Sequence, residues 1–412
     1  MHKSSKAERV INDNDKNIIN LEVDEQIISF RGLRPKRVRF ELEYGLERGS
    51  TANSFLFTNE NSSEIPILVH PPGAAFAKLF IPALEKKLST NQKKLKVIVG
   101  HVNPNRVDLL KKLAKIYPDL ELICSGPGAK LIKDIWCMKK PSQSNSEETE
   151  LAEISIPQIL QIKNTETMKI GQNELQLIPT PSARWPGCLM AFEKTVGLLM
   201  SDKFFGAHLC TKDWAETNRS STEEERRHYY DCLMAPMANQ VDQIITKLEE
   251  LEIQTIAPCH GPAIEQSWRS LLTDYMRWGE SQKETTLKVV LLFASAYGNT
   301  AAIADALARG ISKTEVSVIS LNCEFTSSTE LISQIKKADA YLIGSPTLGG
   351  HAPTPILSAL GALLAEGDRN KSIGIFGSYG WSGEALDLLE NKLRDGGFEF
   401  GFQPIKIKFS PN

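Results

Sequence analysis

Three short loops decide the fold of the second half of the chain: Ser295-Ala296-Tyr297-Gly298-Asn299-Thr300, Ser345-Pro346-Thr347-Leu348-Gly349-Gly350 and Gly377-Ser378-Tyr379-Gly380-Trp381-Ser382-Gly383. Each loop follows a short apolar run of strand length and precedes a stretch with helical periodicity. Strands that alternate with helices favour a parallel sheet with helices on both faces. We therefore predict a doubly wound α/β domain over residues 287–412.

The elements around these loops can be assigned from the same alternation. Helices are predicted to begin near Thr300, Thr329, Pro355 and Glu384, with Thr354 as the N-cap before Pro355, and Gly396 suits a helix stop. Because the chain ends soon after the fifth strand, we expect the closing helix of such a domain to be absent. The predicted strands are residues 287–294, 316–321, 340–344, 372–377 and 404–409.

The three loops predict a flavin site. In doubly wound sheets the ligand binds at loops that leave the carboxyl ends of the strands. Small residues in the first loop let backbone N–H groups and a helix N-terminus hold a phosphate, and aromatics flanked by glycines in the third suit a flat isoalloxazine ring. One such turn is common, but three are hard to obtain by accident. The predicted FMN-binding residues are Ser295, Tyr297, Gly298, Asn299, Thr300, Pro346, Thr347, Leu348, Gly349, Gly350, Ser378, Tyr379, Gly380, Trp381 and Gly383.

The first half of the chain reads as a separate α/β domain over residues 26–280, preceded by a flexible N-terminus at residues 1–25. The polar stretch at residues 281–286 separates the two halves. A helical pattern over residues 223–250 should break near Pro236, which cannot donate a helix hydrogen bond. Residues 141–150 are predicted to form an exposed loop, and strands are predicted at residues 37–43, 53–57, 96–100, 174–178, 189–192, 196–200 and 255–257.

Composition indicates a soluble cytoplasmic protein. The 412 residues carry a net charge of −2, and no basic run with interleaved aromatics suggests nucleic-acid binding. The seven cysteines form no C-x-x-C pair, which fits a reducing compartment better than a disulfide framework. The polar N-terminus does not read as a secretory signal, and no apolar run predicts insertion into a membrane.

Two stretches match known family motifs, His101-Val102-Asn103-Pro104-Asn105-Arg106 in the first half and Tyr297-Gly298-Asn299-Thr300 in the second. The first resembles the H-x-E-x-D-H motif of the flavodiiron proteins, and the second resembles a flavodoxin phosphate loop. The resemblance to the flavodiiron proteins covers roughly residues 26–410, in the family order. The resemblance implies a metallo-β-lactamase-like αβ/βα sandwich followed by a flavodoxin-like domain. Further matching segments are residues 48–54, 184–186, 201–206, 257–262 and 344–347.

The strand that begins at Arg37 is most similar to the class of oxygenic phototrophs that appends a flavin reductase domain. We expect that appended domain to be absent from this chain.

The resemblance also implies which residues would hold the family's two irons. This chain retains His101, Asp202 and His260 at family ligand positions. Amides are poor iron ligands and a guanidinium has no lone pair to give, so the substitutions raise the formal charge of the pocket by about +4. We therefore expect iron to be absent or substoichiometric. The substituted positions are Asn103, Asn105, Arg106 and Arg184.

Three uses of such a pocket stay open. Asp202 can pair with Arg184 or Arg106 as a buried ion pair, because a buried carboxylate needs a partner. His101, Asp202 and His260 can instead hold one metal ion, since two histidines and one carboxylate are a known ligand set. The pocket can also bind an anion such as chloride or phosphate.

The family resemblance implies electron transfer from NAD(P)H through FMN to dioxygen, which is reduced to water, within a head-to-tail dimer. We accordingly expect an oxidoreductase subunit, as a homodimer or with a related flavodiiron chain that holds intact iron. The alternative is an FMN-binding regulatory or structural partner without turnover of its own. No catalytic residue is assigned. Hydrolysis is disfavoured because Asn103, Asn105 and Arg106 remove zinc ligands.

Overall fold

The structure is a computed structural model, and its described residues form two compact units. Unit 1 comprises Met1–Pro181, Trp185–Tyr229 and Leu248–Leu271, and unit 2 comprises Ser182–Arg184, Tyr230–Lys247 and Leu272–Asn412. Within these described ranges no helix is both long and apolar enough to cross a bilayer. The structure describes residues 8–13, 16–35, 38–40, 44–46, 48–58, 65–89, 92–137, 154–170, 173–182, 184–283, 287–312, 314 and 316–409.

The first sheet of unit 1 has eight strands in the order β1-β2-β3-β6-β7-β8-β9-β10. Pairing is antiparallel from β1 to β7 and parallel from β7 to β10. The strands are β1 (Glu8–Asp13), β2 (Lys16–Asp24), β3 (Ile27–Arg34), β6 (Ser50–Phe57), β7 (Ile67–Val69), β8 (Lys94–Ile98), β9 (Asp119–Ser125) and β10 (Gln158–Ile162).

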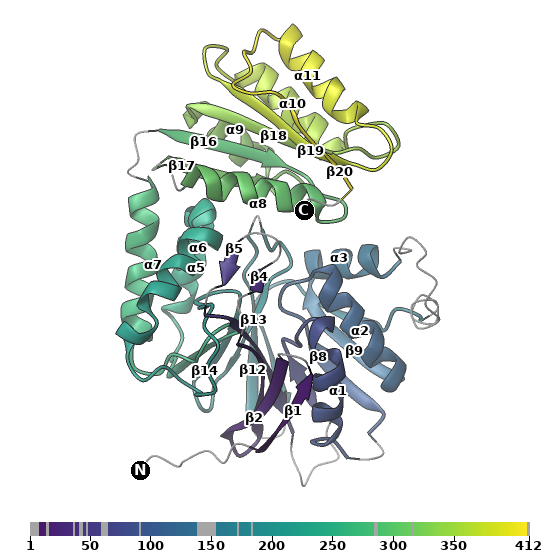
Figure 1. The fold of residues 1–412 in the computed structure, drawn as a ribbon, viewed down its shortest axis with the longest axis vertical. Coiled ribbons are helices and arrows are strands. Elements are labelled where there is room, and N and C mark those ends of the chain that lie inside the picture. Colours follow the sequence, from purple (N-terminus) through teal and green to yellow (C-terminus); the bar gives the residue numbers. More distant parts are fainter. Residues whose placement is uncertain are drawn as a thin grey trace. The chain divides into compact units, whose positions relative to one another are not determined.

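Helices cover one face of this sheet (Figure 1). They are α1 (Ala77–Glu85), α2 (Pro104–Ile116) and α3 (Gly126–Trp136), and η1 (Ala74–Phe76) precedes α1. Their apolar side chains pack with those of the strands in one buried cluster. A separate hairpin pairs β4 (Val38–Phe40) with β5 (Tyr44–Leu46).

The second sheet of unit 1 has the order β11-β12-β13-β14-β15, and only the β14–β15 pair is parallel. Phe55 and Ile98 of the first sheet share a buried cluster with Leu177 and Met200 of the second. The two sheets therefore enclose a common core, as the predicted sandwich requires. The strands are β11 (Glu166–Ile170), β12 (Asn173–Pro179), β13 (Leu189–Glu193), β14 (Leu198–Asp202) and β15 (Thr255–Pro258).

The structure corrects the prediction of a flexible segment over residues 1–25. Residues 8–13 and 16–24 form β1 and β2, and Ile18, Ile19 and Leu21 are buried. Polar flanking residues hid this short apolar run, which the pairing with β3 brings into the core. The predicted loop at residues 141–150 and most of the predicted strand at residues 37–43 lie outside the described residues.

The helical region of the first half breaks where Pro236 was predicted to break it. α5 (Glu223–Leu233) ends before η3 (Ala235–Met237), which leads into α6 (Ala238–Leu248). η2 (Arg219–Ser221) precedes α5, and α7 (Trp268–Lys283) follows β15. By contacts most of these helices group with unit 2, so the unit boundary differs from the predicted one near residue 280.

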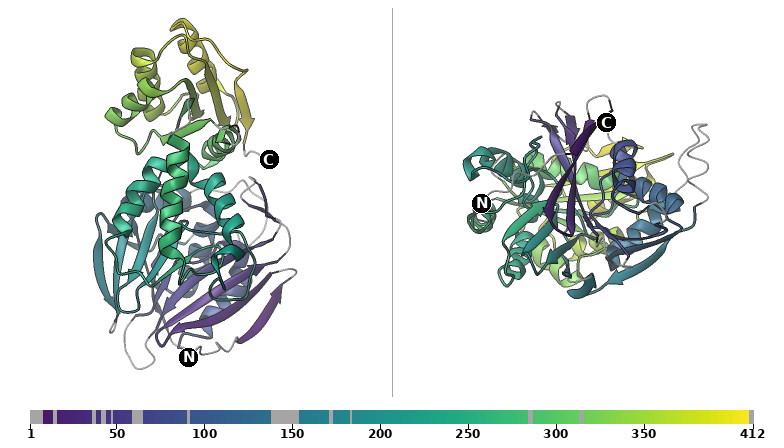
Figure 2. Two further views of the ribbon diagram at one scale, coloured as in Figure 1. Left: turned by 90° about the vertical axis from the view of Figure 1, so that its left-hand side faces the viewer. Right: turned by 90° about the horizontal axis from the view of Figure 1, so that it is seen from below.

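Unit 2 contains the predicted doubly wound sheet. Its five strands are all parallel in the order β17-β16-β18-β19-β20. α8 packs on one face, and α9, α10 and α11 pack on the other (Figures 1 and 2). The elements are β16 (Lys288–Phe293), α8 (Asn299–Ser312), β17 (Ser317–Asn322), α9 (Ser328–Lys337), β18 (Ala340–Pro346), α10 (Thr354–Glu366), β19 (Ile373–Tyr379), α11 (Glu384–Asp395) and β20 (Ile405–Lys408).

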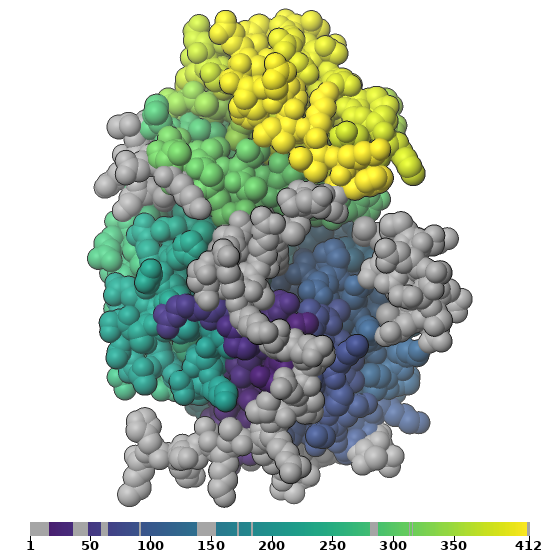
Figure 3. Space-filling model, in the orientation of Figure 1, coloured from purple at the N-terminus to yellow at the C-terminus, as the bar shows by residue number. Residues whose placement is uncertain are grey.

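The predicted helix ends in unit 2 hold to within one residue. Gly396 caps the C-terminus of α11, as predicted. α10 begins at Thr354 with Pro353 as its cap, one residue earlier than predicted, so Pro355 lies at the second helical position. In the space-filling view the green-to-yellow residues of this unit form a continuous packed surface (Figure 3).

Candidate functional site: a flavin cavity and a polar pocket

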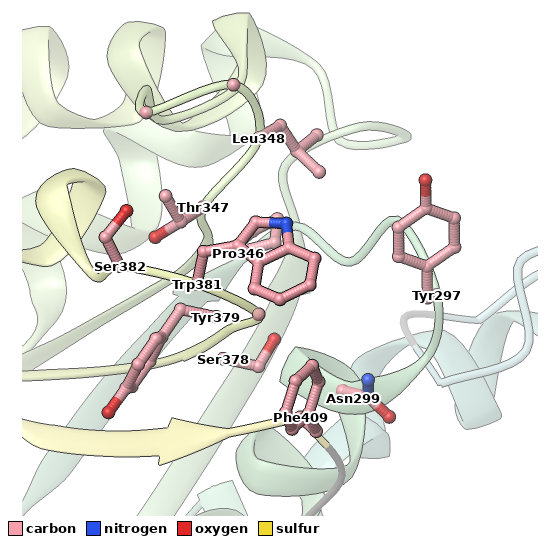
Figure 4. Close-up of a pocket in the computed structure, with 13 residues that line it drawn as sticks. Tyr297, Asn299, Pro346, Thr347, Leu348, Ser378, Tyr379, Trp381, Ser382 and Phe409 are labelled. Carbon is pink, nitrogen blue, oxygen red and sulfur yellow. The ribbon is translucent and has the colours of Figure 1, made fainter. Parts of the chain in front are cut away.

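The three loops of unit 2 meet around a cavity of about 400 Å³. Figure 4 shows that its side chains come from the loop before α8, the loop after β18 and the loop after β19, with one from the end of β20. Because the strands are parallel, their carboxyl ends bring these segments to one edge of the sheet. The cavity is lined by Tyr297, Asn299, Pro346, Thr347, Leu348, Gly349, Gly350, Ser378, Tyr379, Gly380, Trp381, Ser382 and Phe409.

The first loop is held by its own polar side chains. The Ser295 hydroxyl accepts a hydrogen bond from Ala301 N at 3.1 Å, which fixes the start of α8. The buried hydroxyls of Thr300 and Ser378 lie 2.8 Å apart and join the first loop to the third. Gly298 adopts φ +83°, a conformation that other residues rarely adopt.

The second loop turns tightly between Leu348 and His351, which exchange two backbone hydrogen bonds of 2.9 and 3.1 Å. Gly349 and Gly350 form the turn with φ of +57° and +81°. A side-chain carbon added at either glycine would meet no atom within 4 Å. The glycines therefore serve backbone geometry and leave open space beside the cavity.

The cavity fits the predicted FMN in two respects. The buried Thr347 hydroxyl oxygen has no hydrogen-bond partner among the described residues, and such groups usually await a ligand or water. The indole of Trp381 is 90% exposed, and its ring lies edge-on to that of Phe409 at 6.4 Å between centroids. An exposed aromatic wall beside an unpaired hydroxyl and open glycine backbone suits a flat ring with a polar tail.

Most of the predicted flavin residues line this cavity. Ser295, Gly298, Thr300 and Gly383 do not, and the first three instead shape the start of α8. Two lining residues, Ser382 and Phe409, were missed. Phe409 follows the fifth parallel strand, so the shared edge of the sheet was the signal that would have found it.

A second pocket, of about 240 Å³, lies in unit 1 and is lined by five of the seven positions that the resemblance predicted for the iron site. Three of its lining residues, Arg34, Arg106 and Lys203, are cations, and none of the described lining residues is an acid. The lining residues are Arg34, Ser50, Thr51, Ala52, Asn53, Pro72, Gly73, Ala75, Phe76, His101, Asn103, Asn105, Arg106, Lys203, Cys259 and His260.

Asp202 lies behind this pocket, fully buried at the end of β14. His101 Nδ1 approaches the two carboxylate oxygens at 2.8 and 3.0 Å, and His101 N donates to Oδ2 at 2.7 Å. Arg106 Nη1 lies 3.7 Å from Oδ1. Asp202 itself adopts φ +49°, an unusual conformation for a residue with a side chain. Of the two pairings left open for Asp202, the structure contains the one with Arg106.

The charges of this cluster follow from its surroundings. Burial and the neighbouring Arg106 charge lower the pKa of His101 to about 3, against the opposing pull of Asp202. Burial by itself would raise the pKa of Asp202, but the contacts with His101, then His70 and Arg106, hold it well below its usual range. Asp202 is therefore ionised and His101 neutral at physiological pH.

The two substituted amides in the motif serve the backbone. Asn103 caps α2, because its side-chain oxygen accepts a hydrogen bond from Arg106 N at 2.8 Å. The Asn105 side-chain oxygen accepts from Ala75 N at 3.3 Å. The side-chain oxygens of both asparagines thus accept hydrogen bonds from the backbone, a role that competes with binding a metal ion.

The last family histidine is also engaged on both ring nitrogens. His260 Nδ1 lies 2.6 Å from Thr51 O, and His260 Nε2 lies 3.3 Å from Lys203 Nζ. Lys203 is 1% exposed, and its ammonium stands 5.6 Å from the centroid of the Trp185 ring. Lys203, which directly follows Asp202 in the chain, was not among the predicted pocket residues.

Arg184, predicted in the same pocket, is not among the described residues that line it. Its guanidinium Nη1 lies 2.7 Å from Asp305 Oδ2 on α8, and both side chains are largely buried. The charge that the sequence assigned to the pocket at Arg184 is therefore compensated elsewhere, whereas Lys203 adds a charge that was not counted.

These residues do not fit a di-iron centre. The Asp202 carboxylate already accepts from His101, and the lone pair of His260 faces an ammonium. In the described part of the chain, no group of three or more histidine, cysteine, aspartate or glutamate side chains is arranged to hold a metal ion. Cationic side chains instead lie beside two of the acceptors, with Arg106 near Asp202 and Lys203 near His260 Nε2.

Comparisons with known proteins cover both units. The family described as "ODP family beta lactamase" matches residues 51–261, and the family described as "Flavodoxin" matches residues 291–412. The Flv1 flavodiiron core from Synechocystis, solved after metal soaking, aligns with a TM-score of 0.85 and 41% identity over 96% of this chain and 94% of that one.

Curated relatives are longer than this chain. Diflavin flavoprotein A 6 of Nostoc is 41% identical over 91% of this chain and 62% of its own length. Diflavin flavoprotein A 3 of Synechocystis is 42% identical over 93% of this chain and 61% of its own length. The chain thus spans about three fifths of these relatives. Two matching domains in order, a shared fold and this identity place the chain in the flavodiiron family, among the diflavin flavoproteins A.

Proposed function

We propose that this chain is the FMN-carrying core of a flavodiiron-type oxidoreductase subunit. The observation that carries the proposal is the cavity of about 400 Å³ at the carboxyl edge of the parallel sheet, with its unpaired Thr347 hydroxyl. When bound there, FMN would supply one- and two-electron transfer. Thr347, the loop glycines and Trp381 would hold and orient it, and no step beyond this positioning is assigned to them.

The electrons would come from NAD(P)H or a reductase and would pass towards dioxygen, with water as product. We propose that this chain does not complete that reduction with two irons of its own, because His101 and Lys203 occupy the acceptors that a metal would use. A related flavodiiron chain with intact ligands would then complete it, within a homodimer or hetero-oligomer. The seven free cysteines support a reducing compartment such as the cytoplasm.

The alternative is an FMN-binding partner that regulates or stabilises another chain without turnover. In this alternative the cationic pocket binds an anion. The buried Nε of Arg106 supports anion binding, because it has no hydrogen-bond partner among the described residues. The two functions differ in what flavin removal does. An electron-transfer role requires FMN for oxygen consumption with a metal-competent chain, whereas a structural role requires it only for stability.

The first experiment measures flavin and metal in the purified chain. About one FMN and negligible iron per chain are expected. Two irons per chain in native material would contradict the proposal, and a chain without affinity for FMN would remove its basis. Mixing with a metal-competent diflavin flavoprotein and NAD(P)H then separates the two roles: oxygen consumption above the sum of the parts supports electron transfer, and an unchanged rate supports the regulatory alternative.

A further inference from the structure

The Lys203 ammonium contacts Nε2 of His260, the ring nitrogen through which this histidine would bind a metal ion. Thr51 O can only accept, so the hydrogen of the His260 ring lies on Nδ1, at 2.6 Å from that carbonyl. The lone pair therefore lies on Nε2. An ammonium has three donors and no acceptor, so the 3.3 Å contact between Lys203 Nζ and Nε2 uses this lone pair.

The backbone fixes both partners in this arrangement. Gly261 N donates to Thr51 Oγ1 at 2.7 Å, and Gly261 has φ +88° with Ala207 O only 2.6 Å from where a Cβ would stand. On the other side, Tyr229 donates its hydroxyl to Lys203 O at 2.8 Å. These separate contacts fix the backbone next to His260 and the backbone carbonyl of Lys203, while the His260 ring is fixed by its own contact with Thr51 O.

The Lys203 ammonium is also stabilised in place. At 1% exposure it is out of water, and the Trp185 ring at 5.6 Å offers its negative face. Lys203 is thus a buried cationic side chain among the residues that line the pocket.

We propose that Lys203 is a built-in cation that takes the place of a metal at His260 and excludes metal ions from it. The inference rests on the proposed function only in taking these positions as the family pocket. It goes further in one respect: the four substituted family ligands are not sufficient to explain the loss of the metal site. Restoring them leaves an ammonium on the His260 lone pair.

The test compares metal binding in the full chain with restored ligands, with and without Lys203. The background carries Asn103→Glu, Asn105→Asp, Arg106→His and Arg184→His. Lys203→Met removes the charge and keeps most of the volume, Lys203→Arg keeps the charge, and Lys194→Met removes an exposed lysine as a control. Iron and zinc per chain are measured by mass spectrometry after dialysis against each metal, together with FMN content and near-ultraviolet circular dichroism.

Lys203→Met should raise metal affinity by at least about tenfold over the background, the size of effect expected from groups next to metal ligands. Lys203→Arg and Lys194→Met should not. Full metal loading with Lys203 present would overturn the inference, and so would no gain in a Lys203→Met chain with unchanged dichroism. Should that variant not fold, Lys203→Gln provides the same comparison. FMN content reports on the flavin proposal independently of either outcome.

Discussion

The flavin cavity of unit 2 and the polar pocket of unit 1 differ in what they leave unpaired. The cavity keeps a buried neutral hydroxyl, open glycine backbone and an exposed indole. In the pocket, the acceptor atoms already have protein partners: the Asp202 carboxylate accepts from His101, and Nε2 of His260 contacts Lys203. A site that awaits a ligand shows unsatisfied groups suited to it. The pocket instead has protein donors at the Asp202 carboxylate and at His260 Nε2.

The largest expected effect comes from removing the Asp202 carboxylate, which contacts both His101 and Arg106. Asp202→Ala leaves the buried His101 without its acceptor and the buried Arg106 without its ion-pair partner. We expect the free energy of unfolding to fall by about 3–5 kcal/mol, as when one partner of a buried pair is deleted. Urea denaturation measures this loss. Glu174→Ala, which breaks the exposed pair with Lys194, is the control and should cost at most about 1 kcal/mol. Equal losses would mean that the pocket is not a closed ionic cluster.

Lowering the pH should decrease the free energy of unfolding of unit 1, because its buried histidines resist protonation in the folded state. The unfolded chain protonates His101 near its usual pKa of about 6.5, whereas the folded chain does so only at about 3. In that window the unfolded state binds more protons, so stability falls as pH falls, by about 1.4 kcal/mol per pH unit for one such group. His70, whose pKa burial also lowers, acts in the same direction.

Asp202 adds its own loss only below about pH 4, because its pKa is depressed in the folded state. Unfolding free energies measured between pH 7 and 4 test the histidine part, and His101→Gln should flatten the slope by about one proton. A slope unchanged in His101→Gln would show that His101 already titrates in the folded protein.

The diversion of Arg184 from the pocket can be tested within unit 2. Arg184→Met removes its 2.7 Å pair with Asp305 and should cost roughly 1–3 kcal/mol, the range for a hydrogen bond to a charged group. Arg394→Met, which breaks the exposed pair with Glu390, is the matched control at about 0–1 kcal/mol. A double-mutant cycle with Asp305→Asn gives the coupling. If Arg184 were instead coupled to Asp202 and not to Asp305, Arg184 would be part of the pocket after all.

The smallest effect sharpens the flavin side of the comparison. Thr347→Val removes the unpaired hydroxyl, so FMN affinity should fall by about tenfold, or 1.4 kcal/mol, while the flavin-free protein loses nothing. Quenching of FMN fluorescence gives the affinity, and Thr347→Ser is the control that should keep it. A destabilised flavin-free Thr347→Val chain would show that the hydroxyl already has a partner.

The sequence by itself determined the doubly wound unit and its loops. Glycines at positive φ and strand–helix alternation are local signals, so Gly298, Gly349 and Gly350 were readable without any long-range contact. The motif around His101 likewise located the pocket along the chain. In contrast, the strand at residues 16–24 was missed because its burial depends on pairing with β3.

Only the tertiary structure decided what the charged residues do. Sequence placed Arg184 and Arg106 together in one pocket, but packing sends Arg184 to Asp305 and leaves Arg106 near Asp202. It also brings Lys203 onto His260, 57 residues away in the chain. A long cationic side chain can reach several partners, and the one it meets is fixed by where distant strands end. Residue type therefore predicted which ligand positions carry amides or arginines, while the tertiary structure shows which partners these and neighbouring side chains meet.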